Sequence, residues 1–170
     1  MNVKCYLIAC LFAVKMCWGQ DFTVQPKLKA EALEKVKSLK TEITNDLNPV
    51  EVNADVVWSE DKTQLAVVLK ASINAGWHIY AFVPDTEPYV VTEVQFDVPE
   101  GFTKCKKVEY SRSKPYDNGV YIYEDQPYFI QYYKIDTINK GIVNAGLYFQ
   151  VCDARKCYPP VLKSKEITLN

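Results

Sequence analysis

The pattern of hydrophobic and polar positions changes once along the chain, at Pro49. After Pro49 apolar residues alternate with polar ones, a period of two that is typical of strands with one buried face. Turn-forming residues interrupt the alternation at short intervals. About nine half-buried strands are predicted, at residues 50–58, 65–73, 77–82, 94–98, 103–110, 120–123, 128–135, 142–151 and 161–169. Because no helical pattern separates them, residues 50–170 are predicted to form one all-β domain, an immunoglobulin-like β-sandwich.

Before Pro49 the period is that of a helix. Within residues 20–49, apolar side chains recur every three or four positions, at Leu33, Val36, Leu39, Ile43 and Leu47. This spacing predicts a short amphipathic helix of about four turns that ends at Asn48-Pro49. We expect the helix to lie against the sandwich or to fray free of it. A spacer or partner-docking helix is the alternative.

Residues 1–19 are predicted to be an export signal. Lys4 precedes an apolar run at residues 5–14, and Cys17-Trp18-Gly19 places small residues where signal peptidase reads them. The run is too short to span a bilayer. We expect cleavage after Gly19 and an exported mature chain. Lipid attachment at Cys10 is disfavoured, because this cysteine lies too near the start to leave a working signal.

Composition excludes several classes of function. The formal net charge is −1 and no basic run is present, so nucleic acid is not an expected partner. His78 is the only histidine, and no further ligands follow it at metal-binding spacing, so no metal is expected. Haem attachment requires Cys-x-x-Cys-His, which is absent. We therefore expect no cofactor. A cysteine–histidine hydrolase is disfavoured because two of the cysteines form a close pair beside two prolines.

Loss of the signal would leave three cysteines, Cys105, Cys152 and Cys157. An odd number in an exported protein indicates one pair and one further thiol. Cys152 and Cys157 are close in sequence, whereas Cys105 falls in a predicted strand, where we expect it to be buried and inert. A disulfide across so short a loop gains little loop-closure entropy, so it would be a weak structural staple.

The residues around this pair suit an exposed, reversible dithiol. Arg155 and Lys156 place positive charge beside both sulfurs and favour the thiolate, which is the attacking form. Asp153 opposes this effect in part. The exit Tyr158-Pro159-Pro160 is biased to extended backbone, which should hold Cys157 at a defined place. An ordinary disulfide that braces a hairpin of a secreted sandwich remains equally open at this level.

Three segments in order resemble the N-terminal periplasmic domain of DsbD-type thiol:disulfide interchange proteins. A strand that leads into Cys152, four residues, Cys157 and then Tyr158-Pro159-Pro160 is similar to the active-site segment of that family, in which some members have five residues between the cysteines. Gly76-Trp77-His78-Ile79-Tyr80 resembles its Gly-aromatic-x-aliphatic-Tyr strand, and residues 114–119 fall where the family has a cap loop. The resemblance covers about residues 50–170.

This resemblance implies a periplasmic protein-disulfide reductase component that passes electrons by dithiol–disulfide exchange through Cys152 and Cys157. Its expected partners are thioredoxin-like domains, held by transient mixed disulfides in which Cys157 is the attacking sulfur. The chain ends after the sandwich, so a membrane-linked thioredoxin-like donor is expected to act in trans, and an oxidised periplasmic protein is the expected acceptor. No bound cofactor is needed.

The resemblance also implies roles for side chains near the pair. Tyr116 stands where the cap ring would cover the disulfide, and Tyr80 is expected beside the dithiol. His78 projects to the same side of its strand as Tyr80, and Tyr158 adjoins Cys157. Trp77 is expected to be an ordinary aromatic of the sandwich. Two other hypotheses remain: a secreted immunoglobulin-like binding module whose disulfide is purely structural, and a partner-binding protein without redox turnover.

Overall fold

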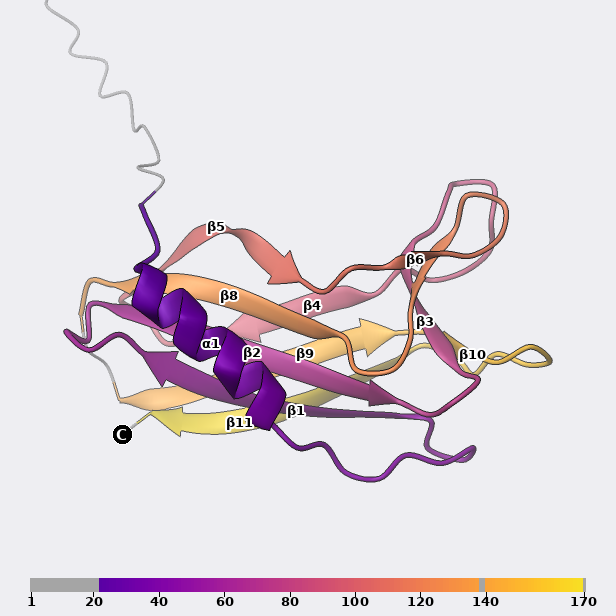
Figure 1. The fold of residues 1–170 in the computed structure, drawn as a ribbon, viewed down its shortest axis with the longest axis horizontal. Helices are drawn as coiled ribbons and strands as arrows, with labels where there is room; N and C mark the ends of the chain where they lie inside the picture. The colour runs from indigo at the N-terminus through magenta and orange to yellow at the C-terminus, as the bar shows by residue number, and fades with distance from the viewer. Residues whose placement is uncertain (1–21, 138–139, 170) are drawn as a thin grey trace, which may run out of the picture.

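The computed structural model describes residues 22–137 and 140–169. The predicted export signal, with its cleavage point after Gly19 and its cysteines Cys5, Cys10 and Cys17, lies outside these residues. The described part has one α-helix, α1 (Pro26–Ser38), followed by strands (Figure 1). In chain order the strands are β1 (Val50–Trp58), β2 (Gln64–Ile73), β3 (His78–Phe82), β4 (Glu93–Asp97), β5 (Phe102–Tyr110), β6 (Lys114–Pro115), β7 (Tyr121–Tyr123), β8 (Tyr128–Ile135), β9 (Gly141–Phe149), β10 (Val151–Cys152) and β11 (Val161–Leu169).

Within the described residues the strands form three antiparallel sheets. One has the order β1-β2-β8-β5, the second has the order β11-β9-β4, and the third has the order β10-β3-β7-β6. The first two sheets share the main hydrophobic core. The third, which we call the small sheet, is built from short strands and lies at one end of the molecule, on the right in Figure 1. The predicted immunoglobulin-like β-sandwich with a short N-terminal helix is thus confirmed.

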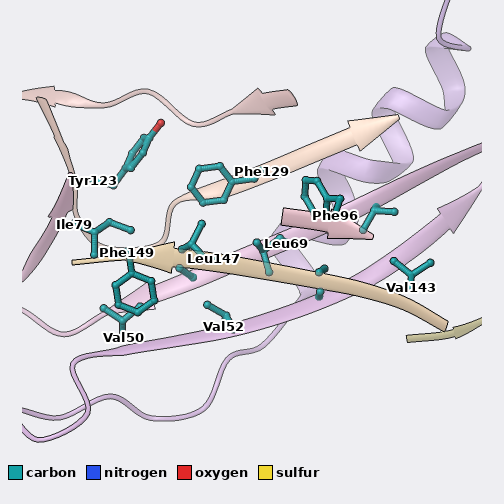
Figure 2. Close-up of a cluster of buried hydrophobic side chains, with 14 of the residues drawn as sticks. Val50, Val52, Leu69, Ile79, Phe96, Tyr123, Phe129, Val143, Leu147 and Phe149 are labelled. Carbon is teal, nitrogen blue, oxygen red and sulfur yellow. The ribbon is translucent and has the colours of Figure 1, made fainter. Parts of the chain in front are cut away.

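The main core lies between the β1-β2-β8-β5 sheet and the β11-β9-β4 sheet. Figure 2 shows its buried side chains, which come from β1, β2, β3, β4, β7, β8 and β9: Val50, Val52, Leu69, Ile79, Phe96, Tyr123, Phe129, Val143, Leu147 and Phe149. Full burial of one such aliphatic or aromatic side chain contributes about 1.5–3 kcal/mol. Ile79 and Tyr123 belong to the small sheet, so that sheet is anchored directly in the main core.

Helix α1 covers the outer face of β1 and β2, and the hydrophobic cluster beneath it extends to Ile130 and Tyr132 of β8. Its buried residues Leu28, Ala32 and Val36 are four positions apart, so they form one stripe along the helix. They belong to a second hydrophobic cluster with Ala66 and Val68 of β2, among others. Strand β2 is therefore buried on both faces, and the prediction of a half-buried strand at 65–73 was wrong. The sequence pattern of β2 does not show what covers its second face.

The helix also ends earlier than predicted. It stops at Ser38 instead of Asn48, and Ile43 and Leu47 are 92% and 90% exposed. The segment after Ser38 contains threonine, asparagine and aspartate, which form local hydrogen bonds that compete with a helix. The Oδ1 atom of Asn45 accepts such bonds from the backbone N–H groups of Leu47 and Asn48, at 2.9 and 3.0 Å. The expectation that the helix lies against the sandwich agrees with the structure.

The predicted strand at 142–151 is divided in two. Strand β9 ends at Phe149, and β10 begins at Val151 and pairs with β3 in a different sheet. Gln150 lies at the break, and its side-chain oxygen accepts a hydrogen bond from the backbone N–H of Val90 at 3.0 Å. This change of sheet carries Cys152 into the small sheet. No helix among residues 22–137 and 140–169 is long and apolar enough to cross a membrane.

Candidate functional site

A disulfide joins Cys152 and Cys157 at the end of the molecule where the small sheet lies (Figure 1). Their Cα atoms are 4.0 Å apart. Cys152, in β10, is only 1% exposed, whereas Cys157, beyond the loop, is exposed to solvent. The two sulfurs therefore differ in access, and a partner molecule can reach Cys157 first. Cys105 takes no part in this disulfide, because it is buried in the cluster beneath α1, as the sequence led us to expect.

The loop between the cysteines is a tight turn closed by Asp153. The backbone N–H of Asp153 donates to the Lys156 carbonyl at 2.9 Å. The carboxylate of Asp153 accepts hydrogen bonds from the backbone N–H groups of Arg155 and Lys156, both at 2.7 Å. These two bonds, with the one from Arg155 the stronger influence, hold the pKa of the Asp153 carboxyl below its ordinary value. The turn is thus stabilised by the ionised carboxylate.

On the buried side, Cys152 belongs to a cluster with Tyr80, Val120 and Ile122. In the β10–β3 pair, Cys152 lies directly opposite His78. The rings of His78 and Tyr80 are perpendicular, with 5.3 Å between their centroids. Both residues thus lie on the disulfide side of β3, next to the buried sulfur.

The segment that contains Tyr116 reaches the same place from β6. The Tyr116 ring is tilted against the His78 ring, with 4.8 Å between centroids, and the residue is 51% exposed. Its backbone N–H donates to the Val120 carbonyl at 2.9 Å, so the segment closes a compact turn between β6 and β7. The sequence predicted an irregular loop here, whereas Lys114 and Pro115 pair with β7 as a short strand.

On the outer side, the residues next to Cys157 are fixed to the core. Tyr158 stacks on Trp77, and the Tyr158 hydroxyl donates to the backbone carbonyl of Asp46 at 2.9 Å. The Lys156 Nζ atom donates to the Tyr158 hydroxyl at 3.0 Å and lies 5.2 Å from the centre of the Trp77 ring. The hydrogen bond to Tyr158 raises the pKa of Lys156, so its ammonium stays charged.

His78 has an unusual environment for an ionisable side chain. It is 5% exposed, and its Nε2 atom is buried without a hydrogen-bond partner among the described residues. Burial lowers the pKa of His78, while the charges of Glu124 and Asp153 oppose this effect. Burial also raises the pKa of Tyr80. The histidine is therefore neutral near pH 7, and the tyrosine hydroxyl keeps its proton.

The described residues contain no group of three or more histidine, cysteine, aspartate and glutamate side chains that could hold a metal ion. The reactive group of this arrangement is the sulfur pair. One sulfur is accessible and the other is enclosed by aromatic rings and a histidine.

The structure brings together the six residues selected from the sequence: Cys152, Cys157, His78, Tyr80, Tyr116 and Tyr158. Two neighbours were missed. Tyr89 stacks on Tyr80 with 4.5 Å between ring centroids, and Asp46 accepts from both Trp77 and Tyr158. Tyr89 directly follows Pro88, outside the predicted strands, and Asp46 lies in a segment predicted to be helical, so the hydrophobic periodicity marked neither residue. Trp77, expected to be an ordinary aromatic of the sandwich, belongs to the main core and also supports Tyr158.

No protein-family model and no curated protein matches this chain. Among solved structures, the fold is similar to the N-terminal periplasmic domain of ScsB from Proteus mirabilis. The sequences are 17% identical, the match covers 76% of this chain and 49% of that one, and the TM-score is 0.49. The chain thus spans about half the length of the ScsB domain.

The fold is also similar to that of the DsbD N-terminal domain of Neisseria meningitidis. Its reduced form is 18% identical over 62% of this chain and 78% of that one, with a TM-score of 0.41. In the structure of its complex with the PilB N-terminal domain, the sequences are 16% identical. That match covers 75% of this chain and 94% of the other, with a TM-score of 0.43. The GAE domain of yeast GGA1 is 12% identical in sequence. That match covers 76% of this chain and 97% of the GAE chain, with a TM-score of 0.41.

Domains of DsbD type, which the sequence resembles, are thus among the structural neighbours. A GAE domain is similar to the chain to about the same degree. Likeness at this level concerns the fold and assigns no function, so what the chain can do follows from its own residues.

Proposed function

We propose that the chain is an exported, periplasmic thiol:disulfide interchange module, a component of a protein-disulfide reductase that works through Cys152 and Cys157. The observation that carries the proposal is the asymmetry of the pair. Cys157 is exposed beyond a tight turn, while Cys152 is 1% exposed behind it. Such an arrangement lets one sulfur bond to a partner while the other waits in contact with it.

The proposed reaction starts from the reduced pair. The Cys157 thiolate attacks one sulfur of a partner disulfide, the partner S–S bond breaks, and the second partner sulfur leaves as a thiolate. Cys152 then attacks the Cys157 sulfur, which closes the disulfide present in the structure and releases the partner as a dithiol. Two electrons pass to the partner. Exchange with a reduced donor, in the opposite sense, regenerates the Cys152–Cys157 dithiol.

Two features support Cys157 as the exchanging sulfur. Its neighbours Lys156 and Tyr158 are held by Trp77, so Cys157 is presented from a fixed part of the loop. The charged Lys156 ammonium favours a thiolate nearby. The negative charge of Asp153 opposes formation of the thiolate, but its carboxylate accepts hydrogen bonds from two backbone N–H groups of the turn.

We propose thioredoxin-like domains as the partners, with a membrane-linked donor in trans. The support is the order of three motifs in the chain: residues 76–80, residues 114–119 and the cysteine segment. We also propose that Tyr116, which lies against His78, belongs to a cap over the pair. A partner would displace this ring before its sulfur reached the disulfide.

The reduction potential tests the proposal. The protein is equilibrated in glutathione and dithiothreitol buffers, and the Cys152 and Cys157 thiols are counted by alkylation and mass spectrometry. An exchange module should have a potential more oxidising than about −300 mV, whereas structural disulfides lie below about −300 mV. A value below that limit would favour the binding module with a structural disulfide. Cys105→Ala restricts the measurement to the pair.

A further inference from the structure

The buried sulfur of the pair must lose a proton before it can react. Cys152 is 1% exposed and packs with Tyr80, Val120 and Ile122. Apolar surroundings raise the pKa of a thiol, and only the thiolate attacks a disulfide. The second step of the exchange is therefore slow unless a neighbouring group accepts the proton of Cys152.

His78 occupies a position from which it can accept the proton of Cys152. It is directly opposite Cys152 in the β3–β10 pair. Side chains at opposite positions of an antiparallel pair project from the same face, with Cβ atoms about 4.5–5.5 Å apart. The Nε2 atom of His78 is buried and has no hydrogen-bond partner among the described residues. An unpaired buried polar atom is costly, so its presence in a folded protein calls for an explanation.

The groups around His78 keep the imidazole neutral. Tyr80 of its own strand and Tyr116 of the β6–β7 turn contact its ring. Glu124, after β7, and Asp153, in the disulfide loop, act on it through their negative charges. These charges raise the pKa of His78, but burial lowers it more strongly. A neutral imidazole with an unused nitrogen is a proton acceptor at pH 7.

We propose that His78 accepts the proton of Cys152 in the resolving step, an inference that rests on the proposed exchange function. The Cys152 proton moves to Nε2, and the thiolate attacks the Cys157 sulfur of the mixed disulfide. The Cys152–Cys157 bond forms, the bond from Cys157 to the partner breaks, and the partner sulfur leaves as a thiolate that takes up one proton. In the reverse reaction the imidazolium protonates Cys152 as it leaves.

Stopped-flow reaction of the reduced protein with dithiobis(nitrobenzoate) separates the two steps. Attack by Cys157 releases a first equivalent of thionitrobenzoate, and resolution by Cys152 releases a second. His78→Gln should leave the first release unchanged and slow the second by roughly 100-fold at pH 7, at the low end of the effect of a positioned acid or base. Tyr121→Phe, an exposed position on β7, is the matched control and should change neither release.

The pH profile distinguishes proton transfer from a structural effect. In the wild type, the second release should slow as the pH falls through the pKa of His78, which lies below the ordinary imidazole value of about 6.5. In His78→Gln the rate of the second release should rise with pH up to and beyond about pH 8.5, because it then depends only on ionisation of the thiol. Equal profiles in the two proteins would overturn the inference and leave the exchange function intact. If His78→Gln does not fold, a wild-type second release that keeps rising up to and beyond about pH 8.5, with no plateau above the pKa of His78, overturns it.

The same experiment also examines the premise. If the folded wild-type protein releases no thionitrobenzoate, or one equivalent without resolution, the exchange function fails and the role of His78 fails with it. A second release that is fast, His78-dependent and lost at low pH supports both.

Discussion

The ring of Trp77 stacks on the ring of Tyr158, with 5.2 Å between centroids and 9° between planes. Trp77 is 3% exposed and belongs to the main core, whereas Tyr158 directly follows Cys157. The stack therefore joins the exit of the disulfide loop to the core of the sandwich. Hydrogen bonds of the Tyr158 hydroxyl with Lys156 and Asp46 complete the connection.

This connection predicts different effects for its two rings. Trp77→Ala should lower the free energy of unfolding by about 3–5 kcal/mol, since it leaves a cavity in the core. Tyr158→Phe keeps the stack and removes only the hydroxyl, so it should cost about 0.5–1.5 kcal/mol. Urea unfolding of both variants measures these differences, with Tyr121→Phe as the exposed control. Equal losses at Trp77 and Tyr158 would contradict a connection carried mainly by the buried ring.

The cap predicts faster access to the disulfide when its ring is removed. Tyr116→Ala should increase the rate of reduction by dithiothreitol severalfold, because access to the sulfurs helps to set exchange rates. Tyr121→Ala removes an exposed ring from the neighbouring strand β7 and should leave the rate unchanged. Unchanged rates in both variants would show that the segment around Tyr116 is a simple connection.

The unequal exposure of the cysteines predicts which one bonds to a partner. The probe is a thioredoxin variant whose single active-site cysteine carries a thionitrobenzoate group. Cys152→Ala should form a stable mixed disulfide with it through Cys157, because no resolving thiol remains. Cys157→Ala should form little, because Cys152 is buried. Non-reducing gels and intact masses record the products. The opposite result would exchange the roles of the two cysteines.

The position at which α1 ends predicts that two substitutions, one under the helix and one beyond its end, have different effects on stability. Leu28 is 1% exposed under the helix, so Leu28→Ala should lower the free energy of unfolding by about 2–5 kcal/mol. Ile43 is 92% exposed beyond the helix end, so Ile43→Ala should change it by no more than about 0.5 kcal/mol. Chemical denaturation measures both. A large loss at Ile43 would instead favour the longer helix that the sequence pattern predicted.

The turn at Asp153 predicts a stability difference that depends on pH. Its folded pKa lies below the ordinary value because the Arg155 and Lys156 N–H groups bind the carboxylate. The stabilisation is therefore complete above the unfolded pKa of about 4 and is lost as the pH falls through the lower folded value. The loss of stability in Asp153→Ala should be constant from neutral pH to about pH 5 and shrink below about pH 4.

Urea unfolding across this range checks the prediction for Asp153. Asp153→Asn retains an acceptor oxygen without the titrating charge, so it should lose less stability than Asp153→Ala at neutral pH. A difference between wild type and Asp153→Ala that stays the same at all pH values would show that the ionised carboxylate does not stabilise the turn.

Local features of the sequence were sufficient for the sandwich and for the identity of the sulfur pair. The alternation after Pro49 reports directly which strand faces are apolar, and it predicted the positions of most strands. Four intervening residues keep Cys152 and Cys157 close in any fold, so their pairing needed no long-range information. The resemblance of residues 76–80 to a known strand directed attention to His78 and Tyr80.

Tertiary structure alone decided how far the helix extends, which strands are covered twice, and what surrounds each sulfur. Ile43 and Leu47 continue the apolar spacing of α1, yet they are 92% and 90% exposed. The pairing of Cys152 with His78 depends on the break at Gln150, which moves β10 to another sheet. Periodicity describes one strand at a time. Register between strands distant in sequence depends on packing across the whole domain, which no local pattern contains.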